Sequence, residues 1–334
     1  MMKRWLMSLV CVWTLLGCTP QVDQVQFGGP TMGTTYHVKY ILDENTPSVD
    51  LVQKQVDTLL EQVNAQMSTY QHDSELSQFN QYVGSEPFPV SHDTATVVRE
   101  AIRLHAVTQG KLDVTVGPLV NLWGFGPEGR PNVTPTEQAL EEKRSQIGIE
   151  RLSVVNDTLI KTQPSVYVDL STIAKGWGVD KIANYLDNNH INNYMVEVGG
   201  EIRLKGHNRN GVPWRIAIEK PIDNERTVQE IISPKDMAMA TSGDYRNYFE
   251  QDGVRYSHII DPQTGRPIHH RVVSVTVLHP SCMTADGLAT GLMVLGEHQG
   301  LEVAEQQNLP VLMIVKTEDG FKTVTSTAFQ SYLN

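Results

Sequence analysis

One stretch near the end of the chain combines an apolar helical pattern with two oxygen-bearing side chains. In SCMTADGLATGLMVLG, residues 281–296, leucines and a methionine recur at helical spacing, and Thr284 suits an N-cap. Asp286 and Thr290 are four residues apart, so both lie on one face of this helix, and the small residues Ala285, Gly287, Ala289 and Gly291 surround them. Two interpretations stay open here. One is a polar outer face, and the other is a site that offers hard oxygen ligands and close backbone approach.

A second stretch has the form of a strand, a turn and a helix start. VYVDLSTIAKGWGVD, residues 166–180, runs from an apolar strand through Asp169 and a Ser-Thr turn to Lys175 and two glycines. Free backbone N–H groups and the partial positive charge of a helix N-terminus suit a phosphate group. The alternative is simple capping of the helix by Ser171 or Thr172, which the residues alone favour.

A histidine follows in RYSHIIDPQTGRPI, residues 255–268. We expect His258 to lie inside an apolar strand that ends in a turn at Asp261, with Thr264 close behind. A neutral imidazole there could accept a proton from a hydroxyl nucleophile. A lone histidine on such a strand is, however, more often a hydrogen-bonded core residue.

Three further stretches carry aromatic and polar residues at the ends of elements. GKLDVTVGPLVNLWGFGP, residues 110–127, places Trp123 and Phe125 among glycines, where aromatic side chains can face a flat ring or fill a core. MGTTY at 32–36 and MSTYQHDSELSQFN at 67–80 add Met, Thr and Tyr. The commonest signatures are absent: the chain has no Walker loop, no G-x-G-x-x-G after a strand, no H-E-x-x-H, no zinc-binding cysteine pair and no G-x-S-x-G.

The elements that must position these residues mix without a regular strand–helix–strand rhythm. We expect a strand at 34–42, helices at about 49–67, 93–109, 135–146 and 173–189, and mostly strands from Asn193 onward. The later strands read YMVEV, EIRLKG, WRIAIE, MAMAT, RYSHII, VVSVTVLH and PVLMIV. This order favours an α+β fold over a doubly wound sheet.

The first residues predict export. Lys3 and Arg4 precede an apolar run that ends at Gly17, too short to span a bilayer and typical of a secretory signal. The run ends in Leu-Leu-Gly-Cys18, which resembles the bacterial lipobox; an ordinary signal with an incidental cysteine is the alternative. We therefore expect a signal peptide at 1–17, then a lipidated Cys18 and tether at 18–30. The protein would be anchored by lipid to a bacterial membrane and face the periplasm.

Charge and cysteine content narrow the function classes. The chain has 27 Lys and Arg against 38 Asp and Glu, and removing residues 1–17 leaves 25 against 38, a net charge of −13. A chain this acidic, without a basic cluster, is a poor candidate for nucleic-acid binding. If this protein binds a phosphate group, a metal ion or backbone amides must therefore neutralise the phosphate charge. After export and lipidation only Cys282 remains free, which excludes an internal disulfide.

In combination and order, these motifs resemble the FAD:protein FMN transferases, the ApbE flavin-transferase family. The resemblance runs from about residue 30 to the end, and AKGWGVD, SHIIDPQTG and TADGLAT are its most specific parts. It implies a T-fold-like α+β domain over 31–334, in one piece or two lobes, with mixed strands and helices around a cofactor cleft. The matching stretches are MGT, MSTY…SELSQFN, DVTVGPLV…WGFG, DLSTIAKGWGVD, VEVGGEIRLKG, ATSGDYRNYF, YSHIIDPQTGRP and TADGLATGL.

The resemblance implies a reaction. With Mg²⁺, or Mn²⁺ as an alternative, such enzymes split the pyrophosphate of FAD, pass FMN to a Thr or Ser hydroxyl of an acceptor protein and release AMP. The acceptors are typically parts of membrane redox complexes or other extracytoplasmic electron-transfer proteins. Two rivals stay open: hydrolysis of FAD to FMN and AMP, and flavin binding without reaction.

The resemblance also implies roles for single residues. The side chains of Asp286 and Thr290 and the carbonyl of Ala174 would hold the metal, an all-oxygen set that suits Mg²⁺. His258 would be the base, and Lys175 would assist electrostatically. The residues expected to contact FAD are Met32, Tyr70, Lys111, Leu112, Asp113, Ser171, Trp177 and Ile260.

Overall fold

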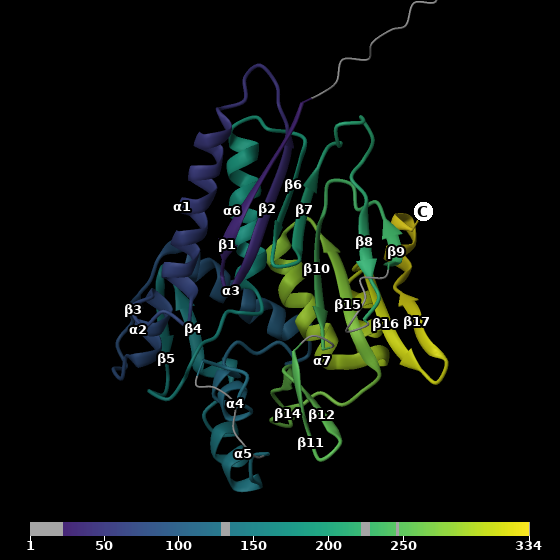
Figure 1. Ribbon diagram of the computed structural model, residues 1–334. Coiled ribbons are helices and arrows are strands. Elements are labelled where there is room, and N and C mark those ends of the chain that lie inside the picture. The colour runs from purple at the N-terminus through teal and green to yellow at the C-terminus, as the bar shows by residue number, and fades with distance from the viewer. Residues whose placement is uncertain (1–22, 128–133, 222–227, 245–246, 334) are drawn as a thin grey trace, which may run out of the picture.

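The computed structural model describes residues 23–127, 134–221, 228–244 and 247–333. One eight-stranded antiparallel sheet runs through this part of the chain in the order β1-β2-β6-β7-β10-β15-β16-β17 (Figure 1). Its mixture with helices confirms the predicted α+β class. The strands are β1 (Gln24–Thr31), β2 (Thr34–Ile41), β6 (Tyr194–Val198), β7 (Glu201–Lys205), β10 (Ala238–Gly243), β15 (Val272–His279), β16 (Val311–Thr317) and β17 (Gly320–Thr325).

The helices include those that the apolar periodicity predicted, with ends shifted by a few residues except at the C-terminal end of α7 (Cys282–Gln306), and also shorter ones that it did not predict. They are α1 (Val49–Met67), α2 (Glu75–Gln81), α3 (His92–Val107), α4 (Gly117–Leu122), α5 (Glu137–Arg144), α6 (Ala174–Asn188) and α7 (Cys282–Gln306). Short 3₁₀ segments occur at Ile149–Arg151 and Thr327–Tyr332. None of the described helices has the length and apolar character of a membrane span.

Four small sheets complete the described elements. They are β3 (Phe88–Pro89) with β5 (Thr158–Lys161) and β4 (Leu152–Val155), β8 (Ile216–Glu219) with β9 (Val228–Ile232), β11 (Tyr248–Gln251) with β12 (Val254–Ser257), and β13 (Ile260–Asp261) with β14 (Arg266–Pro267). The predicted strand RYSHII is therefore wrong as one element, because β12 ends before His258 and β13 begins after it. The histidine lies in the connection, where its ring is not constrained to one face of a sheet.

The central strands are buried on both faces. Val275 and Val277 of β15 belong to the apolar cluster that α7 and α3 share, whereas Leu278 packs in the cluster under β8 and β9. Helices α1 and α6 cover the β1–β7 half of the sheet, and α7 covers β10 and β15 (Figure 1). This arrangement brings the N-terminal ends of α6 and α7 together.

Helix α7 begins earlier than predicted. Ser281, not Thr284, is its N-cap, and the Ser281 hydroxyl accepts a hydrogen bond from the backbone N–H of Thr284. The helix also runs longer, with non-helical backbone at Gly296, where φ is 78°. Next to that kink the ring of His270 donates a hydrogen bond to the carbonyl of Met293.

The glycines of α7 serve packing rather than the approach of a ligand. A Cβ at Gly287 would lie 2.6 Å from Leu104 of α3, and one at Gly291 would lie 2.4 Å from Thr108. The glycine that brings two backbones together is instead Gly176 of α6, where a Cβ would lie 2.4 Å from the carbonyl oxygen of Cys282. The expectation that the small residues around Asp286 admit a ligand is therefore wrong for these two glycines.

The predicted tether at 18–30 is wrong over its second half, because residues 24–31 form β1. This strand pairs with β2 in register from Gln24 opposite Ile41 to Thr31 opposite Thr34. Pro30 is tolerated because β1 is an edge strand, where a missing N–H leaves no ladder bond unmade. The signal peptide at 1–17, Cys18 and the start of the tether lie outside the described residues.

If β1 is structural, a chain that begins at Met32 will be less stable than one that begins at Asp23. The Phe27 ring packs edge-on against Tyr36 and Tyr40, with 6.3 Å between ring centroids in each case. Burying such a ring is worth about 2 kcal/mol, so we expect at least that loss in the free energy of unfolding, measured by urea denaturation. Equal stability of the two chains would mean that residues 23–31 act only as a linker.

Candidate functional site

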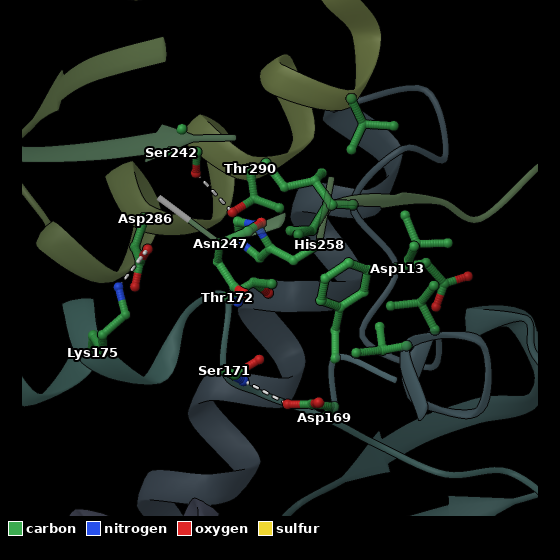
Figure 2. A pocket seen from close by; sticks show the side chains of 18 of the residues that line it. Asp113, Asp169, Ser171, Thr172, Lys175, Ser242, Asn247, His258, Asp286 and Thr290 are labelled. Carbon is green, nitrogen blue, oxygen red and sulfur yellow. Dashed lines mark hydrogen bonds and ion pairs between the residues drawn. The ribbon is translucent and has the colours of Figure 1, made fainter. Parts of the chain in front are cut away.

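Most of the predicted site residues converge on one cavity of about 460 Å³. It lies where the start of α6, the first half of α7, the end of β10 and the loops around residues 111–113 and 258–262 meet (Figure 2). Nine predicted site residues line this cavity: Tyr70, Lys111, Leu112, Asp113, Ser171, His258, Ile260, Asp286 and Thr290.

Asp286 joins α7 to α6 at the polar end of the cavity. One carboxylate oxygen, Oδ2, accepts a hydrogen bond from the backbone N–H of Gly176 at 3.0 Å. The other, Oδ1, lies 3.9 Å from the ammonium of Lys175 (Figure 2). One turn further along α7, the Thr290 hydroxyl lies 3.0 Å from that of Ser242 on β10. Asp286 and Thr290 therefore face the cavity together, as their spacing predicted, and Ala174 stands at the first position of α6.

Glu201 is a buried carboxylate that the sequence analysis did not assign. It opens β7 directly after two glycines with positive φ, and only 3% of its surface is exposed. Its Oε1 lies 2.5 Å from the Lys175 ammonium, whereas the described residues offer no hydrogen-bond partner to its Oε2. In the sequence it is one of three charged residues that alternate with apolar ones in EIRLK, so no pattern set it apart from Arg203 and Lys205.

The three charges at this end of the cavity perturb one another. Burial raises the pKa of Glu201 to about 8, with Lys175 opposing and Asp286 adding to the rise. Burial also raises the pKa of Asp286, although Lys175 and the Gly176 amide counteract it. For Lys175, burial is outweighed by the two carboxylates, which raise the pKa of the ammonium. Lys175 is therefore a buried cation between two acids, one of which, Glu201, is largely protonated at neutral pH.

His258 faces the cavity from the connection between β12 and β13. The ring Nδ1 lies 2.9 Å from the backbone carbonyl oxygen of Asn247, and the backbone N–H of His258 donates to the same oxygen at 3.2 Å. A carbonyl can only accept, so Nδ1 carries the proton and Nε2 keeps a lone pair. The Phe125 ring stands edge-on to the imidazole, 6.3 Å between centroids.

Burial lowers the pKa of His258, with the Asn247 carbonyl opposing and the Lys175 charge reinforcing the shift. The ring therefore stays neutral below its usual titration range, as a general base requires. Asp261, which the sequence placed beside it, instead forms an ion pair with Lys111, with 2.9 Å between Nζ and Oδ2.

Asp113 and Ser171, two of the residues predicted to contact FAD, are held in place by hydrogen bonds within the wall of the cavity. Asp113 is buried, and its Oδ1 accepts hydrogen bonds from the backbone and hydroxyl of Thr115, at 2.8 and 2.6 Å. Ser171 is anchored by its backbone N–H to Asp169 Oδ1 at 2.9 Å (Figure 2). Both line the cavity.

Met32 and Trp177 do not belong to the wall of this cavity. Met32 adopts a left-handed backbone in the turn between β1 and β2, and its methyl group lies near Gly178. The Trp177 ring packs against the main apolar cluster, with the Lys181 ammonium 5.8 Å from its centroid. Their contact with a cofactor stays a prediction.

The donors at the polar end suit a hard divalent cation. The described residues contain no cluster of three or more His, Cys, Asp or Glu side chains that could hold a metal. Asp286, Thr290 and the Ala174 carbonyl would instead offer a carboxylate, a hydroxyl and a backbone oxygen, the ligand types that Mg²⁺ accepts. The unpartnered oxygens of Glu201 and Thr172 belong to residues of the same cavity, so polar bonding capacity remains for a bound group.

Residues 32–313 match the profile of the ApbE family. The chain belongs to the ApbE family. A FAD:protein FMN transferase of Vibrio cholerae is 64% identical over 333 residues, which cover 100% of both chains. The protein of the same name from Haemophilus influenzae is 51% identical over 339 residues and 98% of each chain. The solved structure of flavin transferase ApbE from Vibrio cholerae matches with a TM-score of 0.88 and 65% identity, covering 93% of this chain and 100% of that one.

The environment of His258 predicts its titration. We expect ring nitrogen shifts in NMR to show the proton on Nδ1 and a pKa below 6.5. Replacing Phe125 by Ala should admit water and move that pKa upward, towards the ordinary value, because burial is the main cause of its depression. His270, which burial also keeps at a low pKa and which bonds Met293 instead, serves as the control and should not move. If the pKa of His258 is the same in Phe125→Ala as in the unmodified protein, burial by Phe125 is not the cause of its depression.

Proposed function

We propose that the chain transfers FMN from FAD to a Thr or Ser hydroxyl of an acceptor protein, forms a phosphoester and releases AMP. The observation that carries the proposal is the presence, in one cavity, of a neutral histidine with a free Nε2 and of the Asp286–Thr290 pair. The names of the curated relatives support it.

The two ends of the cavity suit the two parts of the substrate. Val116, Val120 and Phe125, which pack in one apolar cluster, give the cavity an apolar wall that fits a flavin ring, while Lys175 and Asp286 supply charged groups to the lining. Lys175 would attract the pyrophosphate, and the start of α6 would present its partial positive charge to the same group. The acidic chain would need this local positive charge, because its surface as a whole repels phosphates.

His258 would act on the incoming hydroxyl. Its Nε2 accepts the hydroxyl proton while the oxygen bonds to the phosphorus of the FMN half, and the bond from that phosphorus to the bridging oxygen breaks. The bridging oxygen leaves with AMP, and the proton stays on Nε2 until solvent removes it. The Asn247 carbonyl then stabilises the imidazolium by keeping its bond to Nδ1–H.

Asp286, Thr290 and the Ala174 carbonyl would hold Mg²⁺ or Mn²⁺. When bound, such an ion neutralises charge on the pyrophosphate oxygens. The surrounding protein prepares this position by keeping one Asp286 oxygen on Gly176, so that the other faces Lys175 and the cavity.

We also propose export and anchoring by lipid at Cys18, which the first 18 residues support. The active site would then face the periplasm, next to acceptor proteins of membrane or extracytoplasmic redox complexes. Intact mass of the protein from membranes, before and after Cys18→Ser, tests the modification.

The direct test of function is the mass of an acceptor. The chain from Gln21, which keeps β1 complete, is incubated with FAD, Mg²⁺ and a flavin-accepting domain. We expect a gain of one FMN, absent without metal and in Asp286→Ala, because the variant loses the carboxylate that would hold the ion. AMP and free FMN without modified acceptor would point to hydrolysis. Intact bound FAD with several acceptors would point to a flavin-binding protein.

His258→Gln should reduce transfer by about 10²- to 10⁴-fold, the usual worth of a general base, and leave FAD binding nearly unchanged. Flavin fluorescence measures binding, and the initial rate of acceptor modification measures transfer. His298→Gln, an exposed position on α7, is the matched control and should keep full activity. Equal rates for both variants would remove His258 from the mechanism.

A further inference from the structure

Asp180 of α6 is not one of the residues that line the cavity, but its carboxylate caps the first N–H groups of α7. It is only 4% exposed. Its Oδ1 accepts a hydrogen bond from the backbone N–H of Cys282 at 3.0 Å, and its Oδ2 accepts from the N–H of Met283 at 3.0 Å and the Ser281 hydroxyl at 2.7 Å. Arg203 adds a bond to Oδ1 at 2.9 Å.

The contact is reciprocal. Ile173, at the N-cap of α6, makes no side-chain cap bond, and Asp286 of α7 accepts from Gly176 instead. Each helix thus supplies a carboxylate to the other's first turn. The spacing is the same on both, since Asp180 follows Gly176 by four residues and Asp286 follows Cys282 by four.

This exchange determines where Asp286 stands. The first N–H groups of a helix have no partner within it, and buried ones must find one elsewhere. Asp180 supplies that partner for Cys282 and Met283, while Ser281 supplies it for Thr284. If the Asp180 carboxylate is lost, the first turn of α7 must shift or fray, and Asp286 stands only one turn further on.

We propose that Asp180 is a positioning residue for the Asp286–Thr290 site, acting through the N-terminus of α7. The inference rests on the proposed function, because it assigns a role in building the site that would hold the metal. Residues that orient metal ligands without touching the metal typically affect its affinity by 10- to 100-fold.

The test measures Mn²⁺ binding to the full chain in the presence of saturating FAD. The loss of the EPR signal of free Mn²⁺ reports binding, and a protein-free sample with the same FAD corrects for Mn²⁺ bound by FAD itself. We expect Asp180→Asn to weaken Mn²⁺ binding by at least about tenfold, because its amide group cannot accept from every N–H that the carboxylate serves. FAD binding, followed by flavin fluorescence without metal, should change far less.

Asp187→Asn is the matched control. It removes a carboxylate from the same helix, one that lies 3.9 Å from Arg203 and 2.9 Å from Lys205 but makes no described hydrogen bond to α7. It should leave Mn²⁺ affinity within about twofold of the unmodified protein. A thermal melt of each variant separates loss of fold from loss of the site.

The outcomes are distinguishable. If the unmodified protein binds Mn²⁺ and Asp180→Asn binds it equally well, the positioning role is wrong and the proposed function stands. If the unmodified protein binds none, the metal site itself is wrong and the inference fails with it. Should Asp180→Asn not fold, Asp180→Glu replaces it, because its longer side chain keeps the charge but displaces the carboxylate from the N–H groups of Cys282 and Met283: weaker Mn²⁺ binding supports the proposal, and unchanged binding overturns it.

Discussion

Two helix N-termini meet inside this protein, and each is satisfied by a carboxylate from the other helix. Partial positive charges at both ends would repel if no anion lay between them, and their buried N–H groups would go unpaired. Asp180 and Asp286 meet both demands, and Gly176 lets the backbones come close enough for them to do so. The arrangement leaves one oxygen of Asp286 directed at Lys175 and the cavity, so the packing of α6 on α7 also builds the polar end of the site.

The apolar periodicity predicted the helices that carry the site, and the alternation of strands predicted most of the sheet. The local sequence patterns gave wrong predictions where contacts between distant segments determine the structure. β1 was taken for a tether because of its glycines and proline, which an edge strand tolerates. The N-cap of α7 was placed three residues late, because Thr284 and Ser281 both suit a cap and only the neighbouring Asp180 favours Ser281.

The individual site residues show the same limit. Spacing on one helix brought Asp286 and Thr290 together, and that prediction needed no other element. Glu201 escaped notice because its partner, Lys175, lies on another element 26 residues away, and a pattern along the chain does not reveal such a pair. The role of the Asp180 carboxylate, whose partners on α7 lie about a hundred residues further along, was invisible for the same reason.

The proposed base, His258, and the oxygen ligands on α7 come from different parts of the chain. Ser242 at the end of β10 and Asn247 beyond that end contact the two parts. Ser242 contacts Thr290 of α7, and five residues further along the chain the carbonyl of Asn247 holds the His258 ring. β10 is itself paired with β15, whose end leads into α7. β10 therefore contacts the helix that carries Asp286 and Thr290 through Ser242, and the chain beyond its end supplies, at Asn247, the carbonyl that orients the His258 ring, so one segment of the chain bonds to both halves of the site.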